Sequence, residues 1–598
     1  MRVILLIFIL SCSTLLHGQE VLSNLVSNPI LKSKKFIPNK NKSVLDTLPF
    51  FDDFSYNSPV ADADKWQQSS VFINRTYPLN PITVGVATFD GLNENGLARG
   101  FSQSNPSEPS DTLLSQAINL SGVNSVYLMF YFQGKGIGDA PQTQDSIVLE
   151  FLNDTLAWEQ IWFSTGQAMQ EFDKVVKLID EPRFLYNSFQ FRFRNYATLS
   201  GNFDHWHIDY VKLDEMLSAS DTTELNDVSF VYGAPSFLKR YEQMPWTHFK
   251  YNELVEINDT AAIFLRNNGA SINVDYQYNV FENNNQIAHY PTLGVSRNAS
   301  VFDYDSIGNF EYKNPPISVS SSVFTSLMPD SVSFLIQHMI STGQQDNKWN
   351  DTLYYQQEFN SSFAYDDGVA ESAYGINASG AKLAYQFKLN RPDTLRAIQM
   401  YFPQMLDSVN HILFKLTVWN NNGGEPGSII HQQEVYPEHT QDGKFHYYYL
   451  DSVFQIIGTF YVGWEQPTNN LLNIGLDKNK LANQYMFYNV GSGWNNSIYP
   501  GSWMIRPIVS MEEVILSSVN ETRHNFLIYP NPAKEELTLV TGSTNNLILI
   551  YNLQGILVKQ LYVSDAESKI NIADLAIGMY VIEIKNKGNR SFQKFIIK

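Results

Sequence analysis

Apolar side chains in this sequence recur at every second residue, in short runs that Gly, Pro, Asn and Asp interrupt. Phe189, Phe191 and Phe193 show the pattern, because one polar residue separates each from the next. Such alternation buries one face of a strand and leaves the other in water. Aromatic residues make up 14% and charged residues 17% of the chain, which suits several packed cores rather than disorder. We therefore predict an all-β, multidomain chain of β-sandwiches.

A chain of 598 residues is expected to hold about four domains. Composition and turn signals divide it after a leader (1–18) and a polar linker or extended arm (19–47). The predicted units are a jelly-roll sandwich (48–215, the first sandwich), an immunoglobulin-like sandwich (222–358, the middle sandwich), a second jelly roll (362–512, the third sandwich) and a small C-terminal sandwich (520–598, the tail sandwich). Within the middle sandwich, Asn268-Gly269 between two apolar runs predicts a β-hairpin.

The chain is acidic, with a formal net charge of −19 and a pI near 5.0. Since negative charge repels phosphate backbones, nucleic acid is not an expected partner, whereas divalent cations are compatible with it. Cys12 is the only cysteine. A disulfide framework, a cysteine nucleophile and cysteine-type zinc sites are therefore excluded from the rest of the chain.

The first residues resemble a secretory signal peptide. Arg2 precedes the apolar run 3–10, which is too short to span a bilayer, and small residues follow. Cleavage after Gly18 would leave Gln19 first. A lipoprotein cleaved before Cys12 is the alternative. No later stretch has transmembrane length, so we expect a secreted or surface-held protein.

The last eighty residues contain about seven short strands. The apolar run that starts at Phe526 ends in the turn Tyr529-Pro530-Asn531-Pro532, because each proline fixes φ and lacks an N–H donor. The segments "YPNPA", "IYNLQGILV", "INIADLAIGMYVIEI" and "FQKFIIK" follow in order to the C-terminus. This pattern predicts a small β-sandwich.

Those four segments together resemble the type A C-terminal sorting domain of the type IX secretion system of Bacteroidota. The resemblance implies export of the folded cargo across the outer membrane, with the translocon and sorting machinery as partners, and no catalysis in the tail. An ordinary immunoglobulin-like domain is the alternative. The residues that carry the resemblance are Tyr529, Pro530, Asn531, Pro532, Gly555, Gly578, Tyr580 and Lys598.

The first sandwich opens with "FFDDFS" and closes with "FDHWHIDYVKL", which resemble the terminal strands of concanavalin-like or MAM-like jelly rolls. In such folds these strands often lie side by side. Asp52 or Asp53 would then approach Asp209 and ligate calcium through oxygen. The alternative is that these carboxylates cap strand ends. His205 and His207 share a face, as a metal pair or as an exposed pair at a sheet edge.

A second acidic group opens the third sandwich in "YDDGVAE". Asp366, Asp367 and Glu371 either hold calcium or orient their own loop. Calcium is accordingly the one cofactor that the sequence suggests. The loops of the third sandwich also gather aromatic residues, and Trp494, Tyr499 and Trp503 are the predicted platform for a ring-shaped ligand.

Familiar catalytic motifs are absent from the sequence. It contains no Gly-x-Ser-x-Gly elbow and no His-Glu-x-x-His pair. Paired carboxylates need only spatial proximity, so a secreted hydrolase of polysaccharide or peptide remains the alternative. The favoured function is a binding or adhesion protein for a glycan or protein ligand, which is more consistent with the missing motifs than an enzyme.

The triplet Asp-Ser/Thr-apolar recurs about a dozen times, for example at Asp111, Asp145, Asp154, Asp351 and Asp451. It resembles the O-glycosylation acceptor of Bacteroidota. The alternative is structural: Asp ends a turn, and the following Ser or Thr begins a strand.

Overall fold

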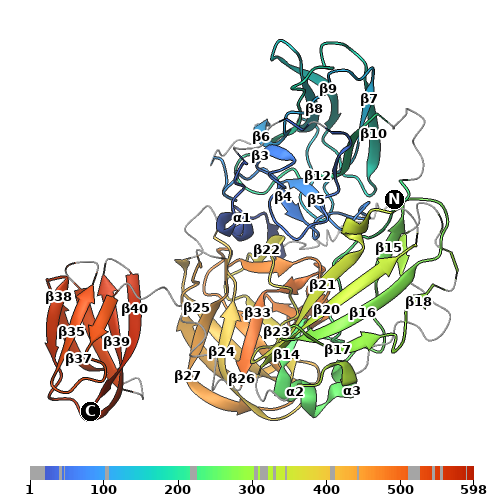
Figure 1. Cartoon of the computed structure of the whole chain (residues 1–598). Coiled ribbons are helices and arrows are strands. Elements are labelled where there is room, and N and C mark those ends of the chain that lie inside the picture. Colours follow the sequence, from blue (N-terminus) through green and yellow to red (C-terminus); the bar gives the residue numbers. More distant parts are fainter. Residues whose placement is uncertain are drawn as a thin grey trace, which may run out of the picture. The chain divides into compact units, whose positions relative to one another are not determined.

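The computed structural model of the chain is built almost wholly from strands, as predicted (Figure 1). It describes residues 20–598 apart from 40–43, 46, 101–106, 216–224, 299, 302, 304–306, 310–320, 327–330, 344–345, 405–410, 441–442, 510–525, 542–543, 545, 553–556 and 587–588. The predicted leader 1–18 lies outside the described residues. The α-helices in the described ranges are short: α1 (Pro29–Ser33), α2 (Trp246–Tyr251) and α3 (Glu253–Glu256). No helix in these ranges has the length and apolar character to cross a membrane.

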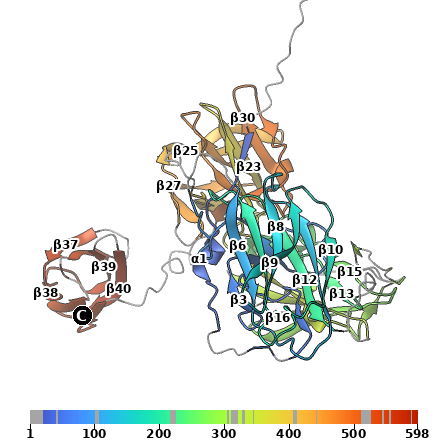
Figure 2. The ribbon, with the colours of Figure 1, turned by 90° about the horizontal axis from the view of Figure 1, so that it is seen from above.

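The first sandwich packs two antiparallel sheets around one aromatic core (Figures 1 and 2). Phe191 and Phe193 are fully buried, as their alternation predicts. One sheet contains β2 (Phe50–Asp52), β4 (Phe72–Asn74), β5 (Val86–Phe89), β7 (Val126–Gly134), β10 (Asp173–Ile179) and β12 (Trp206–Asp214). Its strand order is β10-β7-β12-β5-β4, and β2 also pairs with β12. The other has the order β3-β6-β11-β8-β9: β3 (Trp66–Ser69), β6 (Glu108–Ser115), β8 (Ser146–Leu152), β9 (Trp158–Thr165) and β11 (Phe191–Ala197). Because β2 lies beside β12, the expected adjacency of the terminal strands is confirmed.

The middle sandwich has a three-stranded and a six-stranded sheet. The first has the order β13-β15-β19: β13 (Val228–Phe230), β15 (Phe264–Asn267) and β19 (Ile307–Asn309). The second has the order β14-β21-β20-β16-β17, with β18 on β16: β14 (Gln243–Pro245), β16 (Asp275–Glu282), β17 (Asn285–Tyr290), β18 (Ser296–Arg297), β20 (Val332–Ser341) and β21 (Thr352–Asn360).

The hairpin predicted at Asn268-Gly269 is wrong. β15 and β16, which flank this turn, belong to different sheets, so the turn carries the chain from one sheet to the other. The Asn267 side chain accepts a hydrogen bond from the Gly269 N–H at 2.9 Å and folds the turn locally. A β-hairpin does form between β16 and β17, where Asn283 and Asn284 both adopt positive φ.

The third sandwich contains three sheets. The largest has the order β26-β25-β28-β23-β30-β31: β23 (Lys382–Lys388), β25 (Phe414–Asn422), β26 (Glu425–Val435), β28 (Thr459–Glu465), β30 (Met486–Asn489) and β31 (Asn495–Asn496). The second has the order β27-β24-β33: β24 (Asp393–Met400), β27 (His446–Ile456) and β33 (Ile505–Val509). The last has the order β1-β22-β29-β32: β1 (Glu20–Ser23), β22 (Ser372–Ile376), β29 (Ile474–Asp477) and β32 (Ser502–Trp503).

The middle and third sandwiches share a hydrophobic core. One continuous cluster of buried side chains runs from the middle sandwich, including Trp246 and Phe359, to Val509 of the third. Tyr241 joins the two, since its hydroxyl accepts a hydrogen bond from Lys388 N (3.0 Å) and its ring lies 4.7 Å from that of Tyr365. Residues 1–510 accordingly form one compact unit and residues 511–598 a second.

The segment predicted as a linker or arm is part of the first compact unit. β1 pairs antiparallel with β22, with Glu20 opposite Ile376. The chain then crosses to the first sandwich, where Leu25 N donates to the Asn202 side chain at 2.6 Å. The Asn28 side chain caps α1 by accepting from the Ile30 and Leu31 N–H groups. The segment from β1 to α1 (residues 20–33), called the N-terminal strap below, therefore connects the first sandwich to the third.

The tail sandwich has its own core and two sheets. One sheet has the order β34-β35-β38: β34 (Phe526–Tyr529), β35 (Glu536–Thr541) and β38 (Glu567–Asn571). The other has the order β37-β36-β39-β40: β36 (Asn546–Asn552), β37 (Leu557–Val563), β39 (Gly578–Asn586) and β40 (Asn589–Ile597). The predicted small C-terminal sandwich is thus confirmed.

Candidate functional site

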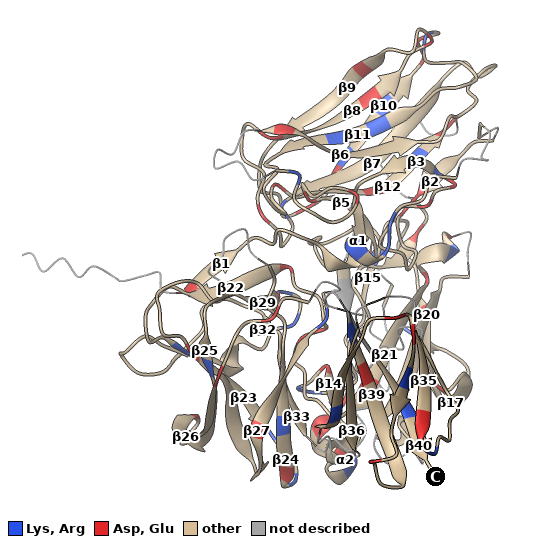
Figure 3. Ribbon diagram, turned by 90° about the vertical axis from the view of Figure 1, so that its left-hand side faces the viewer, with Lys and Arg blue, Asp and Glu red and all other residues tan. Residues whose placement is uncertain are grey.

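Charged residues are sparse along the ribbon (Figure 3), so places where several of them are buried together are the first candidates for a functional site. Asp52, the first predicted calcium ligand, lies at the end of β2 opposite Val211. Its carboxylate is fully buried and accepts hydrogen bonds from Lys65 Nζ (3.0 Å) and Trp66 Nε1 (2.7 Å). Because a lysine already balances its charge, Asp52 acts as a structural ion-pair partner, and its role as a calcium ligand stays a prediction.

Asp53 and Asp209 do come together, as predicted. Thr83 links them: its hydroxyl donates to the Asp53 carbonyl (3.0 Å) and lies 3.1 Å from Asp209 Oδ1, while its N–H donates to Asp209 Oδ2 at 3.0 Å. Burial raises the pKa of Asp209 well above its ordinary value, although the Thr83 hydrogen bonds oppose this. The Asp53 carboxylate reaches the middle sandwich and accepts from Asn347 Nδ2 at 2.7 Å, a contact that sequence spacing did not suggest.

The second predicted group sits beside basic residues that largely balance it. Both carboxylate oxygens of Asp366 accept from Arg506 Nε, at 3.1 and 3.2 Å. Asp367 N donates to the carboxylate of the fully buried Asp477, which sequence analysis missed. Lys480 and Lys478 follow Asp477 directly, and Lys480 pairs with Glu242 at 2.9 Å. Ion pairs therefore join this group to Arg506 of β33 and, through Lys480, to Glu242 of the middle sandwich.

Glu371 is the least satisfied carboxylate of this group. Its Oε2 accepts from Lys478 N at 2.9 Å, whereas its buried Oε1 has no hydrogen-bond partner among the described residues. Burial, followed by repulsion from Asp367, raises the pKa of Glu371 to about 8. Across the described ranges, no three His, Cys, Asp or Glu side chains are arranged as a ready metal site.

The histidines of the first sandwich are core residues. His205 and His207 are fully buried beside the central strand β12, so the expected exposed pair is wrong. Burial lowers their pKa values to about 3 and about 4, which keeps both neutral. His207 hydrogen-bonds to Thr88 Oγ1 at 2.9 Å, and the Tyr77 ring stacks on His205 at 4.9 Å. The alternation showed a shared face but not that this face is covered.

The predicted aromatic platform is not assembled. Trp503 is fully buried and packs against Tyr374 at 4.9 Å, so a ligand cannot reach its faces. Trp494 is half-buried edge-on against Trp419 at 5.7 Å. Tyr499 is half-buried 6.3 Å from the Tyr374 ring. Tyr499 and Trp503 therefore share Tyr374 as a neighbour, whereas Trp494 packs with Trp419 in a separate cluster.

A different aromatic pair faces outward on β27. Tyr448 and Leu450 point into the core, which directs Tyr447 and Tyr449 to the opposite face. The two rings are nearly parallel, with an interplanar angle of 22° and centroids 6.1 Å apart. Tyr449 is 49% exposed. The sequence signal was the dense aromatic run Phe445–Tyr449, which sequence analysis did not use.

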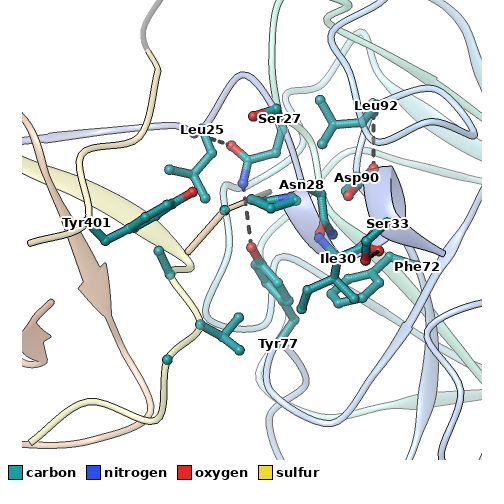
Figure 4. A pocket seen from close by; sticks show the side chains of 16 residues that line it. Leu25, Ser27, Asn28, Ile30, Ser33, Phe72, Tyr77, Asp90, Leu92 and Tyr401 are labelled. Carbon is teal, nitrogen blue, oxygen red and sulfur yellow. Dashed lines mark hydrogen bonds between the residues drawn. The ribbon is translucent and has the colours of Figure 1, made fainter. Parts of the chain in front are cut away.

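A cavity of about 160 Å³ lies where the N-terminal strap meets the first and third sandwiches (Figure 4). Its lining includes Leu25, Phe72, Tyr77, Leu92 and Tyr401, and Asp90 is the only acidic residue among the lining residues that the structure describes. Burial and repulsion from Asp111 raise the pKa of Asp90 to about 8, but Asp111 does not line the cavity. Two carboxyls facing one cleft, which glycoside hydrolysis needs, are therefore not found at this cavity.

The Asp-Ser/Thr triplets often precede strands. Ser146 begins β8 and Thr352 begins β21, as the structural interpretation expects. The hydroxyl residues Thr155 and Ser452 are exposed. Glycosylation of such accessible positions stays a prediction.

The tail motif closes on the C-terminal strand. Asn531 Nδ2 donates to Lys594 O (3.2 Å), and Ile596 N donates to Asn531 Oδ1 (2.9 Å). Lys598 N donates to Ala533 O at 2.9 Å. The resemblance residues are distributed as follows: Tyr529 ends β34, Pro530 and Pro532 flank Asn531, Gly578 begins β39, Tyr580 stacks on Phe595, Lys598 ends the chain, and Gly555 lies outside the described residues.

Comparison with known proteins gives one family match. Residues 527–598 match the secretion system C-terminal sorting domain. No curated protein matches the chain.

Two solved structures are only distantly similar. PorZ, a bacterial surface component of the type-IX secretion system of Porphyromonas gingivalis, is 18% identical over 22% of this chain and 17% of its own, with a TM-score of 0.12. The N-terminal CBM22-1-CBM22-2 tandem domain of Paenibacillus barcinonensis Xyn10C is 6% identical over 79% of this chain and 99% of its own, with a TM-score of 0.19. The chain thus spans about a sixth of the PorZ structure. The tail prediction is confirmed by the family match: the chain carries a type IX secretion sorting domain at residues 527–598, which directs export to the cell surface or beyond.

Proposed function

We propose that this chain is an exported binding protein that takes a glycan on the outer face of β27, either released or held at the cell surface. The observation that carries the proposal is the outward pair Tyr447 and Tyr449, whose rings lie nearly parallel on one rigid strand. Aromatic ring faces carry partial negative charge, so they attract the C–H groups on the flat side of a sugar ring.

Polar groups border the tyrosine pair. Gln399 on β24 lies opposite Tyr447, and Arg506 on β33 lies opposite Gln399. Residues opposite one another in antiparallel strands share a face, so the Gln399 amide adjoins the rings, while the Arg506 guanidinium beyond it is engaged by Asp366. Sugar hydroxyls require such donors beside an apolar platform. A protein is the other class of ligand with which the sequence is compatible, and it would contact the same exposed rings.

The test is a glycan-binding screen on the exported chain, followed by titration of the best glycan. Tyr449→Ala and Tyr447→Ala should each weaken binding about tenfold, which corresponds to about 1.4 kcal/mol. Tyr436→Ala is the matched control, because Tyr436 is 57% exposed but does not belong to the pair. Glycan affinity unchanged in Tyr447→Ala/Tyr449→Ala would refute the proposal.

A further inference from the structure

A group of buried carboxylates lies where the first sandwich meets the middle one. The 3-10 turn η2 (Lys348–Asn350) precedes β21 and points side chains at the first sandwich. Asp53 Oδ2 accepts from Asn347 Nδ2 at 2.7 Å and from Asn350 Nδ2 at 3.3 Å. The same Asn350 Nδ2 lies 3.1 Å from Asp227 Oδ2. One amide therefore faces carboxylates from both sandwiches.

Asp227 and Asp346 form the centre of this group. Both residues line the same small cavity, and the Asp346 carboxylate accepts at 3.3 Å from the backbone N–H of Val228, the residue next to Asp227. Asp346 also accepts from Thr342 Oγ1 (3.1 Å). Two carboxylates on one small cavity repel each other when both are ionised, and a cation bound between them removes that repulsion.

Negative charge in this junction is poorly balanced. Asp53, Asp209, Asp227 and Asp351 are all buried, and the Asp346 side chain is 2% exposed. Within the described part of the chain, no lysine or arginine forms an ion pair with Asp53, Asp209 or Asp227. Lys348 reaches Asp346 (3.7 Å) and Asp351 (3.3 Å), but it is itself 55% exposed.

The group around Glu371 differs, because Arg506, Lys478 and Lys480 lie among its acids. Buried charges are stable only when they are paired or bind a metal. A cation bound at the junction between the first and middle sandwiches would therefore offset more unpaired negative charge than a cation bound near Glu371.

Two further observations indicate a ligand at the junction. Asn350 is fully buried and directed into the carboxylates, yet its Oδ1 has no hydrogen-bond partner. A cavity of about 50 Å³ adjoins the pair and is lined by Asp227, Asp346 and Thr342, among other residues. An amide turned by 180° would place Asn350 Oδ1 where Nδ2 now faces Asp227, since the two atoms are interchangeable in shape. The cavity leaves room for an ion with water.

We propose that Asp227, Asp346 and Asn350 hold a calcium ion at this junction, with Asp53 as a further oxygen donor. Calcium fits because every donor is an oxygen and because it accepts irregular sets of six to eight oxygens, completed by water and backbone carbonyls. The ion links the first sandwich to the middle one.

Calcium binding is tested by melting the whole chain in calcium and in chelator. Calcium at a hundredfold excess over Kd should raise Tm by about 3 °C for a unit of this size. Asp346→Asn should abolish that rise and should melt higher than the wild type in chelator, because it removes the repulsion of Asp227. Asp451→Asn, whose side chain is 69% exposed on β27, is the matched control and should keep the full calcium rise.

Terbium luminescence provides a second test of cation binding, and this test does not require a substitution in the core. Trp349 adjoins Asn350 and is 70% exposed, so Trp349→Phe leaves the core intact. Tryptophan-excited terbium luminescence should appear with the wild type, be displaced by calcium, and decrease in Trp349→Phe. Identical melting of the wild type in calcium and chelator would overturn the proposal. So would a calcium rise that survives Asp346→Asn but disappears in Glu371→Gln, or luminescence undiminished in Trp349→Phe.

Discussion

The Tyr374 hydroxyl donates a hydrogen bond of 2.7 Å to the Glu20 carboxylate, joining the first described residue to a buried ring 354 positions later. The other oxygen of Glu20 accepts from Ile498 N at 3.4 Å. Both contacts fix β1 at the edge of the β22 sheet, so the N-terminal strap acts as a structural part of the third sandwich.

Glu20→Ala should destabilise the first compact unit by about 1.5–3 kcal/mol, because a buried hydroxyl loses a charged acceptor. Urea unfolding of the whole chain measures the change. Glu434→Ala on the solvent side of β26 is the control and should stay within about 0.5 kcal/mol of the wild type. Equal effects of the two substitutions would show that the Tyr374 contact does not stabilise the fold.

Arg506→Met should cost about 3–5 kcal/mol, because it leaves the buried Asp366 carboxylate without its partner. The matched control is Arg297→Met, which breaks a similar two-bond pair with Asp275 where Arg297 is 65% exposed. That exposed pair should contribute little to stability, because water screens it. The double variant Asp366→Leu/Arg506→Met should recover much of the loss. Continued instability of the double variant at the level of Arg506→Met would contradict this account.

Glu371 should make the unit less stable as the pH rises from about 4.5 to about 8. Its pKa is 4.5 in the unfolded reference and about 8 when folded, so the folded state holds a proton that the unfolded state has lost. The stabilisation that Glu371 contributes is complete below pH 4.5 and is lost as the pH rises through 8. Over this range the free energy of unfolding falls by up to about 1.4 kcal/mol per pH unit.

Glu371→Gln should flatten the dependence of unfolding free energy on pH between pH 5.5 and 7.5, measured with urea. Asp367, Asp477, Lys478 and Tyr77 face Glu371 and interact with it electrostatically, so the difference between the two profiles reports Glu371 together with its effect on these neighbours. Glu434→Gln should leave the profile unchanged. A profile of Glu371→Gln that overlays the wild type would exclude a raised pKa.

Deleting residues 526–598 should leave the first compact unit folded, because the tail sandwich has a separate core. Without its sorting domain the protein should remain in the periplasm. Fractionation and immunoblotting measure its location. Asn531→Ala should lower export partly, because it removes both hydrogen bonds to β40, whereas Asn571→Ala removes one local bond and serves as the control. Normal release of the truncated protein would disprove the sorting role.

Local features of this protein could be predicted from its sequence alone. Alternation at Phe189, Phe191 and Phe193 predicted a half-buried strand, and the prolines around Asn531 predicted where β34 ends. Both inferences need only neighbouring residues, because strand period and proline geometry act within a few positions. The sorting domain was recognisable for the same reason, since its motifs are contiguous.

Which strand faces are covered, and which distant carboxylates meet, depends on how the sheets pack. A period of two separates the two faces of a strand, but it does not show whether a second layer covers the polar face. His205 was therefore predicted at the surface and Trp503 in a binding loop, although both side chains are buried. Asp53 meets Asn347 across 294 residues because the two sandwiches dock there. Such contacts depend on the packing of whole sheets, whose geometry no short stretch of sequence contains.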